Sequence, residues 1–257
     1  MTHHAPAEVA LLARQRDVWA CLEGVMDPEL DESVTELNFV THVNVDAQSR
    51  VHVGFRLPTY WCAANFSFLM ADDMRRAVAA LDWVAGVDVV LGEHMYADKI
   101  NAGLERGLSF QETFGDEADG DLDGLRGTFL VKAFQRRQAA LLHHLLAAGH
   151  TPGALVAMSV ADLKALDLSA EGAALLARYF GRRGLVGADG PMAVAFVTAE
   201  GAPLTADTLP KYIAGLRRVG VNAEFNGALC RGLLAVRFDL ETPLKARTRA
   251  HAEVAAS

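Results

Sequence analysis

The sequence is poor in cysteine and has no long hydrophobic run, and each shortage excludes a class of protein. Its three cysteines, Cys21, Cys62 and Cys230, are odd in number and far apart, which excludes a disulfide framework and a CxxC-type zinc site and favours a reducing compartment. No stretch approaches the roughly 20 apolar residues that a bilayer-spanning helix needs, and residues 1–13 lack the pattern of a signal peptide. We therefore expect a cytoplasmic protein without a membrane partner.

Positive charge is also scarce. The 24 Lys and Arg residues are outnumbered by 32 Asp and Glu residues, which gives a net charge of −8. A nucleic-acid binder needs a basic face to neutralise phosphates, so we expect no nucleic-acid partner. Hydrophobic residues make up 51% of the 257 positions, which is ample for a packed core. The length allows one large domain or two small ones.

Signature motifs of common enzymes are absent. The sequence contains no GxGxxG after a predicted strand, no Walker loop, no HExxH and no GxSxG. We therefore predict no catalytic residues and favour a protein that is not an enzyme.

Hydrophobic periodicity predicts an α+β domain over residues 1–114. Apolar residues at helical spacing alternate with segments in which every second residue is apolar. The strand–helix–strand order favours a crossover with parallel strands. The predicted elements, in order, are a helix at 9–26, a hairpin at 39–57, a helix from 62 or 63 to 81 and a strand at 87–91.

An acidic, glycine-rich linker at 115–127 separates this domain from a second module at 128–257. The linker has little to bury, which is typical of a solvated connection. The second module is predicted to be helical at first and then βαββ, because Asn226-Gly227 is a strong signal for a two-residue hairpin. Its predicted elements are helices at 129–148, 159–166 and 170–180, a strand at 193–198, a helix at 208–219 and a hairpin at 221–238.

Cys62 is the first candidate for chemistry, because it lies where a strand gives way to a helix. The partial positive charge of a helix N-terminus stabilises a thiolate, although a buried, inert cysteine is the other interpretation. Asp27 and Glu29 bracket a proline and suit a metal, a basic group of a partner or a solvated turn. Tyr60 and Trp61 precede Cys62 and are either anchors for a partner or rings that cap the core.

Three short stretches and the order of the elements resemble one protein family. Asp27-Pro28-Glu29-Leu30 follows the first helix, Leu37-Asn38-Phe39-Val40 opens the hairpin, and Pro58-Thr59-Tyr60-Trp61-Cys62 leads into the next helix. Over about residues 10–95 this pattern resembles the SufT/PaaD-type iron–sulfur cluster assembly accessory family. Asn38-Phe39 stands where that family usually has Gly-Leu, Ala63 stands where Pro often follows the cysteine, and the four-cysteine tail of PaaD-like members is absent.

The resemblance implies an accessory factor that assembles a metallocofactor or iron–sulfur cluster for a client metalloenzyme. It gives Cys62 a metal-related role and Asp27 and Glu29 a structural or partner role. Iron–sulfur clusters take about four ligands, so one cysteine needs further ligands from a client or from a second copy in a homodimer, or acts transiently. The expected cofactor is thus transient iron or an iron–sulfur cluster, and otherwise none. Other cluster-assembly proteins are expected partners.

Three alternatives remain open at this stage. One is a dedicated chaperone of an oxygenase-like metalloenzyme that binds no cluster. The second is a thiol enzyme in which His52 or His94 acts as the base for Cys62, which requires the imidazole to lie about 3 Å from the sulfur. The third is a scaffold that only docks other proteins.

Overall fold

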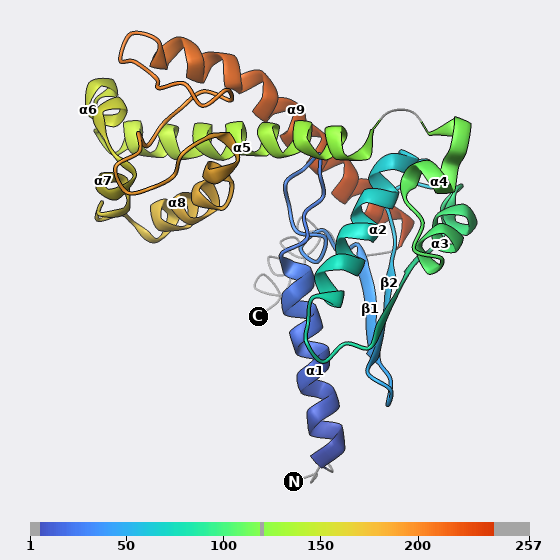
Figure 1. The fold of residues 1–257 in the computed structure, drawn as a ribbon. Coiled ribbons are helices and arrows are strands. Elements are labelled where there is room, and N and C mark those ends of the chain that lie inside the picture. The colour runs from blue at the N-terminus through green and yellow to red at the C-terminus, as the bar shows by residue number, and fades with distance from the viewer. Residues whose placement is uncertain (1–5, 119–120, 239–257) are drawn as a thin grey trace, which may run out of the picture. The chain divides into compact units, whose positions relative to one another are not determined.

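The computed structural model describes residues 6–118 and 121–238, and the chain divides into two compact units (Figure 1). Unit 1 comprises Met1–Leu122 and Asn226–Ser257, and unit 2 comprises Asp123–Phe225. This division corrects the predicted module 128–257, because the chain from residue 226 onward groups with unit 1. Separate folding of the two parts stays a prediction.

A three-stranded sheet with helices packed against it forms the centre of unit 1. β1 (Val40–Val45) pairs antiparallel with β2 (Arg50–Phe55), and β2 pairs parallel with β3 (Gly86–Leu91). α1 (Pro6–Glu23) contacts β1, and α2 (Ala64–Ala79) contacts both β3 and α1. The predicted hairpin, the parallel pairing and the α+β class are confirmed.

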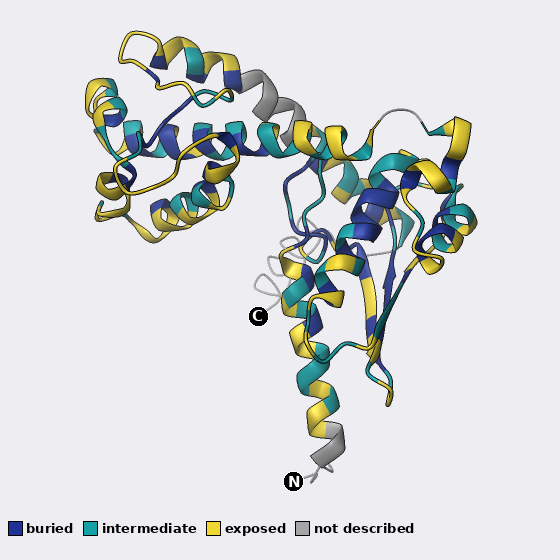
Figure 2. Ribbon diagram, viewed as in Figure 1, coloured by how far each residue is buried: buried dark blue, intermediate teal, exposed yellow. Residues whose placement is uncertain are grey.

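Alternation along the strands determines which face of the sheet is buried. Val43, Val51 and Val53 are 6% exposed or less, whereas His42 and His52 have the opposite parity and reach solvent. Successive side chains of a strand point to opposite faces, so one face joins the core and the other stays wet. In Figure 2 the dark blue of buried residues appears on the strands and on α2.

Two short helices extend unit 1 beyond the sheet. α3 (Ala97–Glu105) contacts β3, and α4 (Phe110–Phe114) contacts α3. Ser109 and Glu112 form a capping box at the start of α4, while Phe110 and Phe114 are buried in the core of the sheet. A 3₁₀ turn, η1 (Gly115–Glu117), begins the predicted linker, but α5 already starts at Leu122 and shortens it.

Unit 2 is helical within the described residues, as its first half was predicted to be. Its core contains side chains from several helices and from the loop at residues 194–204. The elements are α5 (Leu122–Ala147), α6 (Pro152–Ala157), α7 (Val160–Lys164), α8 (Ala170–Arg183), the 3₁₀ turn η2 (Gly184–Val186) and the first part of α9 (Leu209–Arg237).

The predicted strand at 193–198 is wrong: this segment is a buried loop with isolated bridges. Side chains bind its backbone in place of a neighbouring strand. Arg183, only 2% exposed, donates to the carbonyl oxygen of Val194 at 2.9 Å, and Gln138 donates to that of Val197 at 2.8 Å. Buried carbonyl groups must be hydrogen-bonded, and these side chains meet that demand without a sheet.

The predicted hairpin at 221–238 is also wrong, because α9 runs unbroken from Leu209 to Arg237. Helix-favouring Ala, Leu and Arg residues surround Asn226-Gly227, so the dipeptide lacks the flanking strands that a hairpin needs. The last part of α9 buries Leu234 in the core of unit 1. This burial offsets the helix-weakening effect of glycine, which is about 1 kcal/mol per residue. The predicted βαββ arrangement is therefore absent from the described part of unit 2.

Within the described residues, no helix combines the length and the apolar character that crossing a membrane requires.

Candidate functional site

Cys62 lies in the loop that joins β2 to α2, two residues before the helix begins at Ala64. Ala63 occupies the N-cap position and has no side-chain oxygen to cap the first turn. The thiol is half-buried, and the Oγ1 atom of Thr59 lies 3.2 Å from its Sγ atom. The predicted handover from strand to helix at Cys62 is confirmed, and the thiol is held in a defined position by its own loop.

His94 fixes the backbone of this loop rather than the thiol. Its Nε2 atom lies 2.8 Å from the carbonyl oxygen of Cys62, and its Nδ1 atom accepts from the N–H group of Tyr96 at 3.2 Å. These partners define a neutral ring with its proton on Nε2. Burial lowers the pKa of His94, the hydrogen bond to Cys62 opposes that shift, and the charge of Arg237 adds to the lowering.

His52, the other predicted base, lies on β2 and pairs with Asp88 of β3 at 3.2 Å. Neither imidazole is therefore a hydrogen-bond partner of the Cys62 thiol among the described contacts, where Thr59 fills that position. The expected base–thiol contact of about 3 Å is missing in this arrangement.

Tyr60 and Trp61 form an exposed apolar patch beside Cys62. Their side chains are 44% and 71% exposed, and the rings meet edge to face with centroids 5.0 Å apart. Met95, 46% exposed, adjoins this loop, because its backbone N–H group donates to the carbonyl oxygen of Tyr60 at 3.0 Å. The alternative in which both rings cap the core is wrong. We call Tyr60, Trp61 and Met95 the aromatic patch.

Asp27 closes the turn that carries the Asp-Pro-Glu motif. Its Oδ1 atom accepts from the N–H groups of Glu29 at 2.8 Å and Leu30 at 2.7 Å. Burial raises the pKa of Asp27 to about 6, even though these two hydrogen bonds favour the charged form. Asp27 therefore fixes this turn, although its burial disfavours the charged carboxylate.

Glu29 contacts the last part of α9, a segment that the sequence did not connect with this loop. The Nδ2 atom of Asn226 donates to Glu29 at 2.9 Å, and Arg231 pairs with Glu32 at 2.6 Å. At the end of α9, Arg237 donates to the carbonyl oxygen of Leu57 at 3.3 Å. These contacts hold residues 226–237 against the loop of Glu29 and Glu32 and against Leu57, which precedes the Cys62 loop.

Cys230 is the functional candidate that sequence reasoning missed. It is half-buried and packs against the same core as Cys62. Burial, together with negative charge on Asp27, Cys62 and Glu29, raises the pKa of the Cys230 thiol to about 11, and the positive charge of Arg231 opposes this shift. The spacing of Asn226, Cys230 and Leu234 by four residues is the signal that places them on one helix face. The prediction of a hairpin at 221–238 excluded a helix there, so this signal was not used.

No group of three or more His, Cys, Asp or Glu side chains in the described residues is close enough to hold a metal ion. Asp27, Glu29 and Cys62 act electrostatically on the Cys230 thiol, but these four residues do not form a complete ligand set. A tetrahedral iron centre at this region needs ligands from another molecule.

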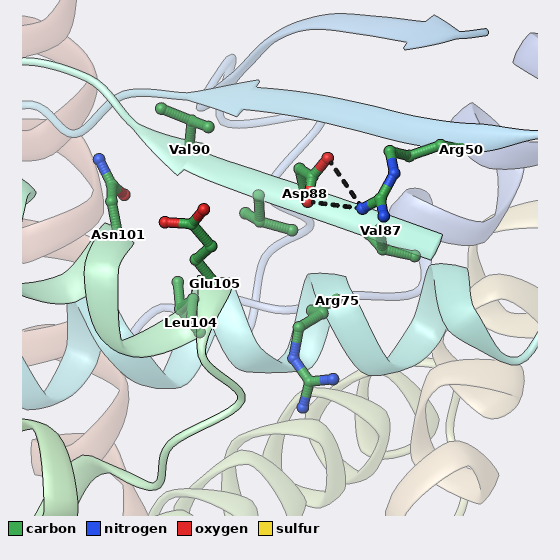
Figure 3. Close-up of a pocket in the computed structure, with 9 residues that line it drawn as sticks. Arg50, Arg75, Val87, Asp88, Val90, Asn101, Leu104 and Glu105 are labelled. Atoms are coloured by element: carbon green, nitrogen blue, oxygen red, sulfur yellow. Dashed lines mark hydrogen bonds and ion pairs between the residues drawn. The ribbon is translucent and has the colours of Figure 1, made fainter. Parts of the chain in front are cut away.

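A separate cavity of about 620 Å³ lies beside β3, an edge strand of the sheet (Figure 3). Charges of both signs line it, and Arg50 donates to the two carboxylate oxygens of Asp88 at 3.1 and 3.3 Å. Arg75, on the opposite wall, pairs with Asp72 at 2.9 Å. None of the predicted site residues lines this cavity, so it is distinct from the region around Cys62.

Residues 15–89 match the family model described as iron-sulfur cluster assembly protein. Over these residues the chain is similar to that family. The match confirms the resemblance seen in the sequence and relates the domain to iron–sulfur cluster assembly. We call residues 15–89 the assembly domain. It contains Asp27, Glu29 and Cys62, and it ends before His94 and Cys230.

The other comparisons add little. No curated protein matches the chain. One similar solved structure is the crystal structure of a domain of unknown function, DUF59, from Bacillus anthracis; it is 17% identical, covers 40% of this chain and 99% of its own, and has a TM-score of 0.31.

One departure from the family pattern has a physical explanation in the structure. Asn38, which stands where the family usually has glycine, adopts a φ angle of 57°. This left-handed conformation favours glycine, and asparagine is among the residues that tolerate it best. The substitution therefore preserves the backbone at the entry to β1.

Proposed function

We propose that this protein is an accessory factor for metallocofactor or iron–sulfur cluster assembly that matures a client metalloenzyme. The assembly domain binds iron or a cluster transiently through Cys62 and passes it to the client as cargo. The protein itself has no catalytic residue on this account, and it works in the cytoplasm.

The observation that carries the proposal is the position of Cys62 within the assembly domain. The thiol is half-buried, its loop is fixed by Thr59 and His94, and the exposed aromatic patch adjoins it. A metal handed from one protein to another must sit where a partner can reach it, and exposed aromatic side chains are favoured at protein interfaces. The cargo site and the docking surface are therefore neighbours.

Two alternatives differ from this proposal in what they require of Cys62. A chaperone that binds no cluster uses the aromatic patch for docking and needs no thiol. A thiol enzyme needs a base at the sulfur, whereas both nitrogens of His94 are occupied by backbone groups. This occupation favours the accessory role over the thiol enzyme.

Anaerobic reconstitution with iron and sulfide tests the proposal. We expect the full-length protein to take up both, and Cys62→Ser to lose most of this uptake. Cys21→Ser is the matched control, because Cys21 is a half-buried thiol on α1 and lies outside the candidate site. Equal uptake by wild type and Cys62→Ser would contradict cluster binding and leave the chaperone as the account of the aromatic patch.

A further inference from the structure

The last part of α9 brings a second thiol to the candidate site. We propose that Cys230 binds the same cargo iron as Cys62, so that the protein offers a two-thiolate site built from the assembly domain and α9. This inference rests on the proposed function, since it extends the ligand set of the same site. Cys230 lies outside residues 15–89, so the family match does not assign it.

Contacts on both sides of Cys230 determine where this part of α9 lies. Asn226, one helical turn before Cys230, donates to Glu29 at 2.9 Å. Arg237, about two turns after it, donates to the carbonyl oxygen of Leu57 at 3.3 Å and to the carbonyl oxygen of Glu93 at 2.9 Å. Residues spaced by three or four positions share one face of a helix. Cys230 therefore lies on the face of α9 that contacts Glu29 at one end and Leu57 and Glu93 at the other.

The loop of Cys62 is tied to the same contacts. Leu57 opens the segment that ends at Cys62, and Glu93 is followed by His94, whose ring binds the carbonyl oxygen of Cys62. Leu234, one turn after Cys230, is 2% exposed in the core that Cys62 also packs against. Both thiols thus pack against the core of unit 1 and interact electrostatically with each other, although they are far apart in the sequence.

Electrostatics around the two thiols suit a cation. Asp27 and Glu29 place negative charge near the Cys230 thiol. A divalent metal is attracted by such charge and by thiolates, and its binding displaces one proton from each thiol. Iron is a natural occupant, since thiolates are soft ligands that select iron–sulfur centres among biological metals. Its remaining ligand positions stay open for sulfide or for the client.

Cobalt(II) is the probe for this site, because its thiolate charge-transfer absorption reports how many sulfur atoms it binds. The full-length protein is titrated with cobalt(II) under anaerobic conditions, alongside Cys62→Ser, Cys230→Ser and the control Cys21→Ser. We expect each of the first two variants to show about half of the wild-type absorption per bound cobalt, with at least about tenfold weaker binding. Cys21→Ser is expected to match wild type.

The outcomes separate this inference from the proposed function. If Cys62→Ser loses the absorption while Cys230→Ser matches wild type, the two-thiolate site is wrong and the proposed function stands. If neither variant changes the absorption, both are wrong.

A second measurement uses the unaltered protein and so does not depend on the folding of a variant. Phenylarsine oxide bridges two neighbouring thiols, forming two As–S bonds and releasing water. We expect one arsenic per chain and joint protection of Cys62 and Cys230 from alkylation by iodoacetamide, as read by peptide mass spectrometry. If either thiol is alkylated at its untreated rate after arsenical treatment, the two thiols do not share a site.

Discussion

The Nε2 atom of His94 lies 2.8 Å from the carbonyl oxygen of Cys62, which joins the loop after β3 to the loop before α2. The hydrogen bond crosses from a residue outside the assembly domain to the cysteine within it. His94 is 5% exposed, so the bond is shielded from water. His94 is therefore a positioning residue for the Cys62 loop.

Replacement of His94 tests this positioning role. We expect His94→Ala to lower the free energy of unfolding by about 1–3 kcal/mol, because the buried carbonyl of Cys62 loses its donor. The loosened loop is also expected to raise the rate at which iodoacetamide alkylates Cys62. His94→Gln, whose amide N–H donates in place of Nε2, is the matched control and is expected to retain most of the stability. Urea denaturation and alkylation kinetics provide the two readouts.

The pH dependence of the same residue has a definite sign. The pKa of His94 is lowered in the folded state, so the unfolded chain binds the proton more tightly. The stability contributed by neutral His94 is complete above the unfolded pKa of about 6.5 and is lost as pH falls below it. We expect wild type to lose more stability than His94→Gln between pH 7.5 and 5. Parallel curves for the two proteins would contradict this assignment.

Asp27 is expected to behave in the opposite way. Its folded pKa of about 6 lies above the ordinary 3.8, so the folded chain binds the proton more tightly and stability falls as pH rises between these values. Asp27→Asn removes the buried charge and keeps an oxygen for the N–H groups of Glu29 and Leu30. We expect this variant to be about 1–2 kcal/mol more stable than wild type at pH 7.5, with no gain near pH 4. A variant less stable than wild type at pH 7.5 would refute the assignment.

The aromatic patch is expected to serve binding rather than stability. Tyr60→Ala combined with Trp61→Ala removes two exposed rings, so we expect the melting temperature to change little, as for most surface substitutions. Capture of the client metalloenzyme is expected to collapse. Val90→Ala, an exposed apolar side chain on β3, is the control for a general loss of surface hydrophobicity. Undiminished capture by the double variant would exclude the patch as the docking surface.

Limited proteolysis tests the division into units. Cleavage within Gly115–Gly124 is expected to leave a folded fragment near residues 1–115, because Phe110 and Phe114 are buried just before this segment. That fragment is expected to co-elute with a C-terminal fragment in native gel filtration, since Arg231 and Arg237 bind Glu32 and Glu93. Denaturing electrophoresis separates the two pieces. The absence of any stable fragment near 1–115 would contradict two units.

Local pattern was sufficient for the sheet and for Cys62. The alternating valines of β1 and β2 place one face inside, and the Pro58–Cys62 segment marks the end of a strand and the approach to a helix, so these positions follow from short-range sequence. The exposure of Tyr60 and Trp61 did not follow from sequence, because short-range pattern allows an aromatic pair in a loop to be either core or surface.

Long-range contacts account for what the sequence did not reveal. Asn226-Gly227 indicates a hairpin when read alone, yet α9 passes through it because Leu234 is buried against the core of unit 1. That same packing holds Cys230 against the core that Cys62 also contacts. The contact of Asn226 with Glu29 joins positions almost two hundred residues apart, which no local pattern encodes.

The central claim is that Cys62 binds iron in the cell. Metal analysis of protein purified anaerobically from its own cells tests this claim most directly. Iron and acid-labile sulfide are measured per chain for wild type, Cys62→Ser and Cys21→Ser, each expressed as the full chain. The account predicts iron in wild type and in Cys21→Ser and its loss in Cys62→Ser. Iron content that is the same in all three proteins, or absent from all three, would contradict a role for Cys62 in holding the cargo.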